Sequence, residues 1–200
     1  RVPIKNDFSK KTLSATLYRK PLWSGVRDIY KWADKIAKEA GLSMPRDTSP
    51  MTNIKNDLKD RERLIARLRD HYQTDNVALM YFINNYYSDE ISATFDISND
   101  NHVEFSIVSF KNPSVIAHEF LHLFGAFDLY LTQYDVKKRD KKKKDKLMEM
   151  FPNEVMAFAN RNLNSLEISG FTKYLIGWEK EMPNAYQKLF LKKGYFTAKY

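Results

Sequence analysis

The residues best suited to chemistry lie in one apolar stretch, Val115 to Asp128, which contains the spacing HExxH. Residues four apart share one face of an α-helix, so the imidazoles of His118 and His122 can reach a single metal ion. Glu119 can then reach a water on that ion without being a ligand, which suits a general base. The pattern predicts a metal-binding helix whose chemistry is hydrolysis.

A third ligand is expected because a catalytic zinc ion takes three protein ligands and leaves the fourth position to water. The chain contains no cysteine, so any ligand must be His, Asp or Glu. Gly125 follows His122 by three residues, and the freedom of glycine at positive φ allows a helix to end and the chain to turn back. Asp128, three residues later, would then point at the metal. We therefore expect Zn²⁺ as the cofactor, held by His118, His122 and Asp128.

Two other arrangements remain open at this point. In a thermolysin-like site the third ligand is a glutamate from a later helix, and Glu149, Glu154 and Glu167 are available. Alternatively, the two histidines are buried without a metal and hydrogen-bond to Glu119. The first leaves the spacing from Gly125 to Asp128 unexplained. The second lacks the dication that would offset the cost of burying these polar groups.

The pattern HExxHxxGxxD resembles the metzincin zinc endopeptidases, in which the last position is usually a third histidine. Two bacterial branches have aspartate there: the snapalysin-like enzymes and, more similar to this chain, the immune inhibitor A-like secreted metalloproteases. Members of the latter tend to continue with a tyrosine, a methionine turn and an apolar segment ending in Gly-Trp. Here these positions read Tyr130, Met156 and Gly177-Trp178. The resemblance covers Ser109 to Trp178.

This resemblance implies a secreted zinc endopeptidase that acts on a protein or peptide substrate. It implies an α/β (α+β) fold, a metzincin-like zincin domain with a mixed twisted sheet over the active-site helix and a helical C-terminal part, spanning residues 1–200 as one catalytic domain. Met156 would form the hydrophobic floor under the zinc ligands. A tyrosine that follows this methionine by two residues in some metzincins is Phe158 here, so Tyr130 or Tyr134 would have to replace it.

The remaining elements follow from the periodicity of apolar residues and from turn residues. An amphipathic helix is expected from Ser24 to Ala40, closed by Gly41, and a second from Ile54 to Tyr72. Three strands and a turn, a helix starting at Pro113 with apolar residues on every side, and two C-terminal helices should follow. The strands are Asn76 to Asn84, Ile91 to Ile97 and Val103 to Ser109, the turn is Ser98 to His102, and the C-terminal helices are Ser165 to Trp178 and Pro183 to Leu191.

The strand from Ile91 to Ile97 is the best candidate for a substrate-binding edge. Ser92, Thr94 and Asp96 alternate there with apolar residues, as in a strand with one buried and one wet face. The more apolar Val103 to Ser109 should lie inside the sheet. An extended peptide is expected to pair antiparallel with the edge strand, because main-chain hydrogen bonds bind any sequence.

Composition limits the remaining classes of function. The 200 residues are 43% hydrophobic, no apolar run is long enough to span a membrane, and the net charge is +8. The segment Lys137 to Lys146 contributes +6 of this charge and is expected to be a solvated loop, although a non-catalytic module could use it to bind a polyanion. Nucleic acid is not the expected partner. Asp96 and Asp100 could be calcium ligands, but a plain hairpin explains them too. Since the chain begins at Arg1, any signal peptide would precede it.

Overall fold

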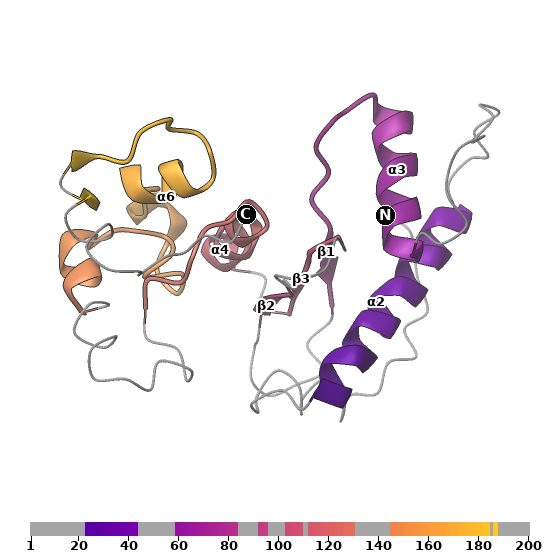
Figure 1. Ribbon diagram of the computed structural model, residues 1–200. Coiled ribbons are helices and arrows are strands. Elements are labelled where there is room, and N and C mark those ends of the chain that lie inside the picture. Colours follow the sequence, from indigo (N-terminus) through magenta and orange to yellow (C-terminus); the bar gives the residue numbers. More distant parts are fainter. Residues whose placement is uncertain are drawn as a thin grey trace. The chain divides into compact units, whose positions relative to one another are not determined.

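The computed structural model describes residues 23–43, 59–83, 92–95, 103–109, 112–130, 145–184 and 186–187 (Figure 1). The chain divides into two compact units, one of residues 1–79, 84–91 and 100–104 and the other of the remainder. Helices and a small sheet make the described part a mixed α/β structure, as expected. That all 200 residues act as one catalytic domain stays a prediction.

The first unit contains the long helix α2 (Trp23–Ser43) and the helix α3 (Asp60–Tyr72). The predicted apolar stripe of α2 is confirmed, since Ile29, Trp32, Ala33 and Ile36 are all buried. The predicted helix end at Gly41 is wrong, because α2 continues to Ser43 while the Gly41 carbonyl accepts a hydrogen bond from Arg67 Nη1 of α3 at 2.7 Å.

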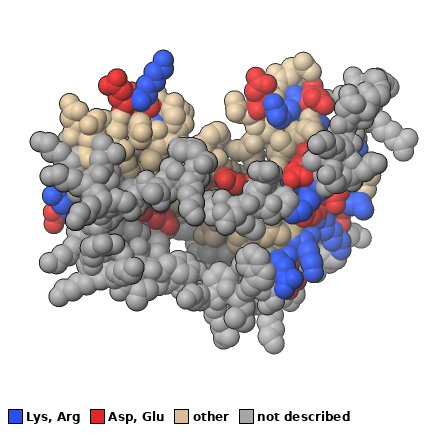
Figure 2. Space-filling view, viewed as in Figure 1, with Lys and Arg blue, Asp and Glu red and all other residues tan. Residues whose placement is uncertain are grey.

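Helix α3 begins later than its apolar pattern suggested. Lys59 has extended backbone, and its N–H donates to Glu62 Oε2 at 2.7 Å, which satisfies a group that the first helical turn would leave free. The continuous helix predicted from Ile54 is therefore interrupted at Lys59, and residues 54–58 lie outside the described residues. On the face shown in Figure 2, both acidic and basic side chains lie over these two helices.

The second unit holds a three-stranded sheet formed by β1 (Met80–Phe82), β2 (Ser92–Phe95) and β3 (Phe105–Val108). The strand order is β1-β3-β2, with β1 parallel and β2 antiparallel to β3. All four residues of β3 are buried, which confirms that this strand lies inside the sheet. Within the described residues β2 is an edge strand, as expected, and the turn 98–102 lies outside them.

The two faces of this sheet differ in chemistry. On one face the Phe105 ring stacks on Phe95 at 5.3 Å and meets Tyr81 edge-on at 5.5 Å. On the other face Thr94 pairs with Ser106, and their hydroxyl oxygens lie 2.7 Å apart. The expectation that Thr94 faces solvent is wrong: it is half-buried, and this polar face contacts the helix that contains HExxH.

The C-terminal part packs a hydrophobic cluster beside that helix. Residues 145–150 are helical, a 3₁₀ turn covers Leu163–Ser165, and α6 covers Gly170–Leu175. The long helix predicted from Ser165 to Trp178 is thus shorter, because the Ser169 hydroxyl accepts from Thr172 N and starts α6 there. Of the helix predicted from Pro183, residues 184, 186 and 187 are helical and the part beyond 187 lies outside the described residues.

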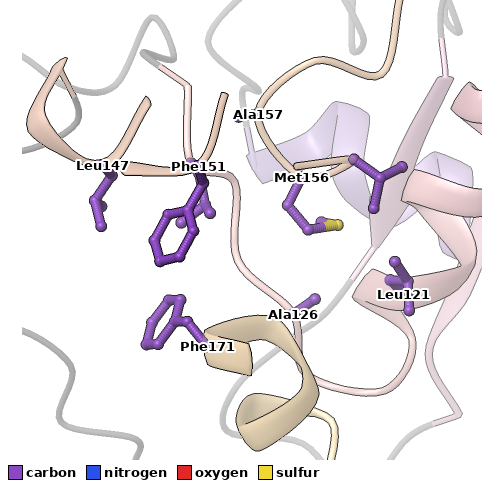
Figure 3. Close-up of a cluster of buried hydrophobic side chains, with 9 residues drawn as sticks. Leu121, Ala126, Leu147, Phe151, Met156, Ala157 and Phe171 are labelled. Carbon is purple, nitrogen blue, oxygen red and sulfur yellow. The ribbon is translucent and has the colours of Figure 1, made fainter. Parts of the chain in front are cut away.

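The core of this cluster is aromatic at its centre. The ring of Phe171 from α6 faces the ring of Phe151 (Figure 3), with centroids 6.4 Å apart. Leu121, Ala126 and Met156 belong to the same cluster. Among the described residues, no helix has the length and apolar character needed to cross a bilayer.

Candidate metal centre

Helix α4 (Pro113–His122) presents the candidate ligands, and local sequence sets both of its ends. It starts where the Asn112 side chain accepts from Ser114 N at 3.1 Å, with Pro113 in the first turn. Beyond its end Gly125 has φ +93°, and Ala126 N donates to Leu121 O at 3.2 Å. The predicted role of Gly125 is confirmed, because this conformation turns the chain back toward the helix.

The turn brings three potential ligand atoms together. His118 Nε2, His122 Nε2 and Asp128 Oδ1 form a triangle with all three sides at 3.1 Å. They are the three residues that could hold a metal ion within the described part of the chain. The sequence prediction had named these same residues.

The opposite nitrogens of both imidazoles are already bonded to backbone carbonyls. His118 Nδ1 lies 3.2 Å from Val155 O, and His122 Nδ1 lies 2.8 Å from Ala126 O. A carbonyl oxygen only accepts, so each Nδ1 carries the proton, and in the neutral ring each Nε2 then has a free lone pair. Two lone pairs and a carboxylate oxygen therefore face one point, an arrangement that is favourable only around a positive charge.

The dimensions of the triangle match a zinc site. Ligand atoms about 2.05 Å from a tetrahedral zinc ion lie about 3.3 Å apart, close to the separations seen here. Two imidazole nitrogens and one carboxylate oxygen are also a common donor set of catalytic zinc, with a fourth position left for water. Carbonyl partners at the far nitrogens, as found for both histidines, are typical of metal-bound imidazoles. The three residues fit a divalent metal ion.

The electrostatics of the cluster also favour a cation. Burial opposes ionisation of both Asp128 and His122, but their mutual hydrogen bond and charges outweigh it. The pKa of the Asp128 carboxyl is held well below its usual range and the pKa of His122 is raised. Because the pKa of His122 is raised, protons compete with a metal ion for this cluster.

Glu119 lies beside this cluster in a nearly dry position, only 5% exposed. Burial raises its pKa, opposed by the nearby charge of His118 and by a hydrogen bond from Thr94. Thr94 Oγ1 donates to Glu119 Oε2 at 2.7 Å. A carboxyl group with a raised pKa is suited to accept a proton and release it again.

Thr94 and Ser106 are functional candidates that the sequence prediction missed. Ser106 Oγ lies within hydrogen-bond distance of both Thr94 Oγ1, at 2.7 Å, and Glu119 O, at 3.1 Å. The two hydroxyls thus connect the sheet to Glu119. The alternation of β2 had marked its polar face, but only the antiparallel register could show that this face meets α4.

Two other sequence predictions concern α4 and Met156. The helix is apolar as expected, but the inference that it is buried on every side is wrong: Phe120 is 38% exposed and packs on Phe124, which lies just beyond the end of α4 and is 40% exposed. Met156 is fully buried, and its carbonyl accepts from Leu129 N at 3.0 Å, one residue after Asp128. Its role as a floor under the ligands stays a prediction.

The alternative glutamate ligands receive no support from their surroundings. Both carboxylate oxygens of Glu154 accept hydrogen bonds from backbone N–H groups, and the side chains of Glu149 and Glu167 are exposed.

Tyr130 stacks on the His118 ring at 5.7 Å, and burial together with the charge of Asp128 raises the pKa of its phenol.

Several remaining predictions fall on residues outside the described part of the chain. These are Tyr134, the possible calcium ligands Asp96 and Asp100, and the segment from Lys137 up to residue 144.

No family model matches the chain, and no curated protein or solved structure matches it either.

Proposed function

We infer that this protein is a zinc-dependent endopeptidase of metzincin-like architecture. The observation that supports this most is the convergence of His118 Nε2, His122 Nε2 and Asp128 Oδ1 beside the buried carboxylate of Glu119. The first three would hold the ion and Glu119 would remain free of it. When bound, zinc would supply Lewis-acid chemistry, polarising a peptide carbonyl and making water more acidic.

In this proposal Glu119 moves the proton. Its carboxylate takes a proton from the attacking water and returns it to the leaving amine, so that one group serves as base and then as acid. Thr94 Oγ1 donates a hydrogen bond to Glu119 Oε2 and holds the carboxylate in place. The other carboxylate oxygen, Oε1, would then take the proton. Burial of Glu119 keeps bulk water from competing for that proton.

The substrate class rests on the edge strand. Since β2 is an edge strand within the described residues and Thr94 connects it to Glu119, a peptide that pairs with β2 would lie near the catalytic groups. We propose an extended protein or peptide substrate, and secretion as in the enzymes that the sequence resembles.

Glu119→Gln tests the assignment directly. The variant should keep zinc, measured by elemental analysis, and lose roughly 10²- to 10⁴-fold of its casein hydrolysis, because amide cannot take the proton. Glu179→Gln, with an exposed side chain, is the matched control and should retain chelator-sensitive activity. Zinc-loaded Glu119→Gln with wild-type turnover would refute the role of Glu119. A wild-type chain with neither zinc nor chelator-sensitive cleavage would favour a binding module instead.

A further inference from the structure

A turn at residues 154–156 supports two of the three candidate ligands. The carbonyl of Val155 accepts from His118 Nδ1 at 3.2 Å, and the next carbonyl, of Met156, accepts from Leu129 N at 3.0 Å. Leu129 directly follows Asp128. Consecutive carbonyls of one turn therefore hold one ligand ring and the backbone beside another ligand.

A buried carboxylate holds this turn in shape. Glu154 is fully buried, its Oε1 accepts from Met156 N at 3.2 Å, and its Oε2 accepts from Ser169 N at 2.5 Å. Glu154 also forms an isolated parallel β-bridge with Glu167, in which Val155 N donates to Glu167 O at 3.0 Å. Burying a carboxylate is costly, and charge-assisted bonds to backbone N–H groups offset that cost.

We propose that Glu154 is a positioning residue of the metal centre, acting through the Val155 and Met156 carbonyls on His118 and Asp128. The inference rests on the proposed metal-binding function of the cluster. Glu154 is not a ligand in this account, because both of its oxygens are bonded to backbone N–H groups. Outer partners of this kind orient the ligands and commonly contribute 10- to 100-fold to metal affinity.

His122 provides an internal reference, because it is held differently. Its Nδ1 is bonded to Ala126 O, and Ala126 N is in turn bonded to Leu121 O at the end of α4. Neither contact involves the turn at 154–156. A disturbance of Glu154 should therefore reach His118 and leave the Nδ1–H of His122 unchanged.

Glu154→Gln tests the proposal, with Glu167→Gln as the matched control at the exposed end of the same bridge. The amide keeps the size of the side chain but turns an NH₂ group toward one of the two backbone N–H donors. We expect zinc affinity, measured by competition with a chromophoric chelator, to fall about 10- to 100-fold. Hydrogen exchange followed by NMR should be faster at His118 Nδ1–H and unchanged at His122 Nδ1–H.

A second pair of variants leaves Glu154 itself intact. Ser169 has φ −65°, which suits proline. Ser169→Pro therefore removes the N–H that donates a hydrogen bond to Glu154 Oε2. Ser169→Ala is its control, since it loses the same capping hydroxyl and keeps the N–H. We expect Ser169→Pro to bind zinc about tenfold more weakly than Ser169→Ala. This pair decides the question if Glu154→Gln does not fold.

Three outcomes would overturn the proposal. One is a folded Glu154→Gln with the zinc affinity of Glu167→Gln; another is equal acceleration of exchange at both imidazoles, which indicates general loosening. The third is equal zinc affinity of Ser169→Pro and Ser169→Ala. If the wild-type chain binds no zinc, the proposed function fails, while imidazole exchange in the metal-free protein still tests whether Glu154 positions His118.

Discussion

The two units each bury a polar cluster, and the clusters differ in kind. In the first unit Arg61 is 1% exposed, its Nε donates to Asp34 Oδ1 at 2.7 Å, and its Nη1 donates to Val103 O at 2.8 Å. The guanidinium also lies 4.8 Å from the centre of the Tyr30 ring. Donors meet acceptors and a cation meets an anion, so this cluster is complete in itself.

In the second unit the partners are alike rather than complementary. The Nε2 atoms of His118 and His122 and a carboxylate oxygen of Asp128, all potential metal ligands, face one another at 3.1 Å. Such a cluster needs a cation from outside, whereas the pair of Arg61 and Asp34 needs none. Buried polar groups indicate a binding site only when they do not satisfy one another's charges and hydrogen bonds.

Removal of Arg61 should have the largest effect on stability. Arg61→Ala leaves Asp34 without its cation; loss of one partner of a fully buried pair costs about 3–5 kcal/mol, and the cost here should lie at or below the lower end because the Asp34 side chain is 23% exposed. Hydrogen exchange in α2 and α3 would measure this. The double variant Arg61→Met with Asp34→Leu should recover most of the loss, because it leaves no unpaired charge. An Arg61→Ala variant as stable as wild type would show that the Arg61–Asp34 pair does not contribute to stability.

Removal of Asp128 should break the second cluster without a comparable loss of stability. Asp128→Ala is expected to weaken zinc binding by more than the roughly 100-fold that an outer-shell partner contributes. Asp128→His should restore part of the affinity, since imidazole is also a good zinc ligand. Chelator competition measures both. If Asp128→Ala binds zinc like wild type and Glu154→Ala or Glu167→Ala does not, the thermolysin-like arrangement is correct.

Metal removal should lower the stability of the metal cluster in the second unit and leave the Arg61–Asp34 cluster unaffected. Zinc at 100 times its dissociation constant should stabilise the second unit by about 2.7 kcal/mol, because it binds the folded state. Exchange rates of α4 amides, measured with zinc and after chelation, would report this. Arg61→Ala should show the same zinc-dependent difference in α4, and Asp128→Ala should show almost none. Equal zinc protection in Asp128→Ala would contradict the assigned ligands.

The smallest effect is expected at Thr94. Thr94→Val keeps the shape and removes the donor to Glu119 Oε2, so peptide hydrolysis should slow about tenfold, equivalent to about 1.4 kcal/mol in the barrier. Zinc affinity should not change, because no bond of Thr94 reaches a ligand atom. Thr94→Ser keeps the hydroxyl and is the control. Should Thr94→Val lose zinc as Asp128→Ala does, Thr94 would instead support the cluster itself.

Local spacing was sufficient to predict the candidate ligands. His118 and His122 are four positions apart, which fixes a shared helix face, and Gly125 is free to adopt the φ of +93° that brings Asp128 back. These relations span only eleven residues, so backbone geometry alone determines them. The same holds for the start of α4 at Asn112 and Pro113.

Tertiary structure alone decided the surroundings of those ligands. Thr94 reaches Glu119 across 25 residues and Val155 reaches His118 across 37, and no local periodicity encodes which loops will meet. Glu154 looked in sequence like a possible ligand, and only its contacts with two backbone N–H groups gave it another role. A sequence determines which groups a helix can present, whereas the partners of those groups depend on long-range packing that many residues settle together.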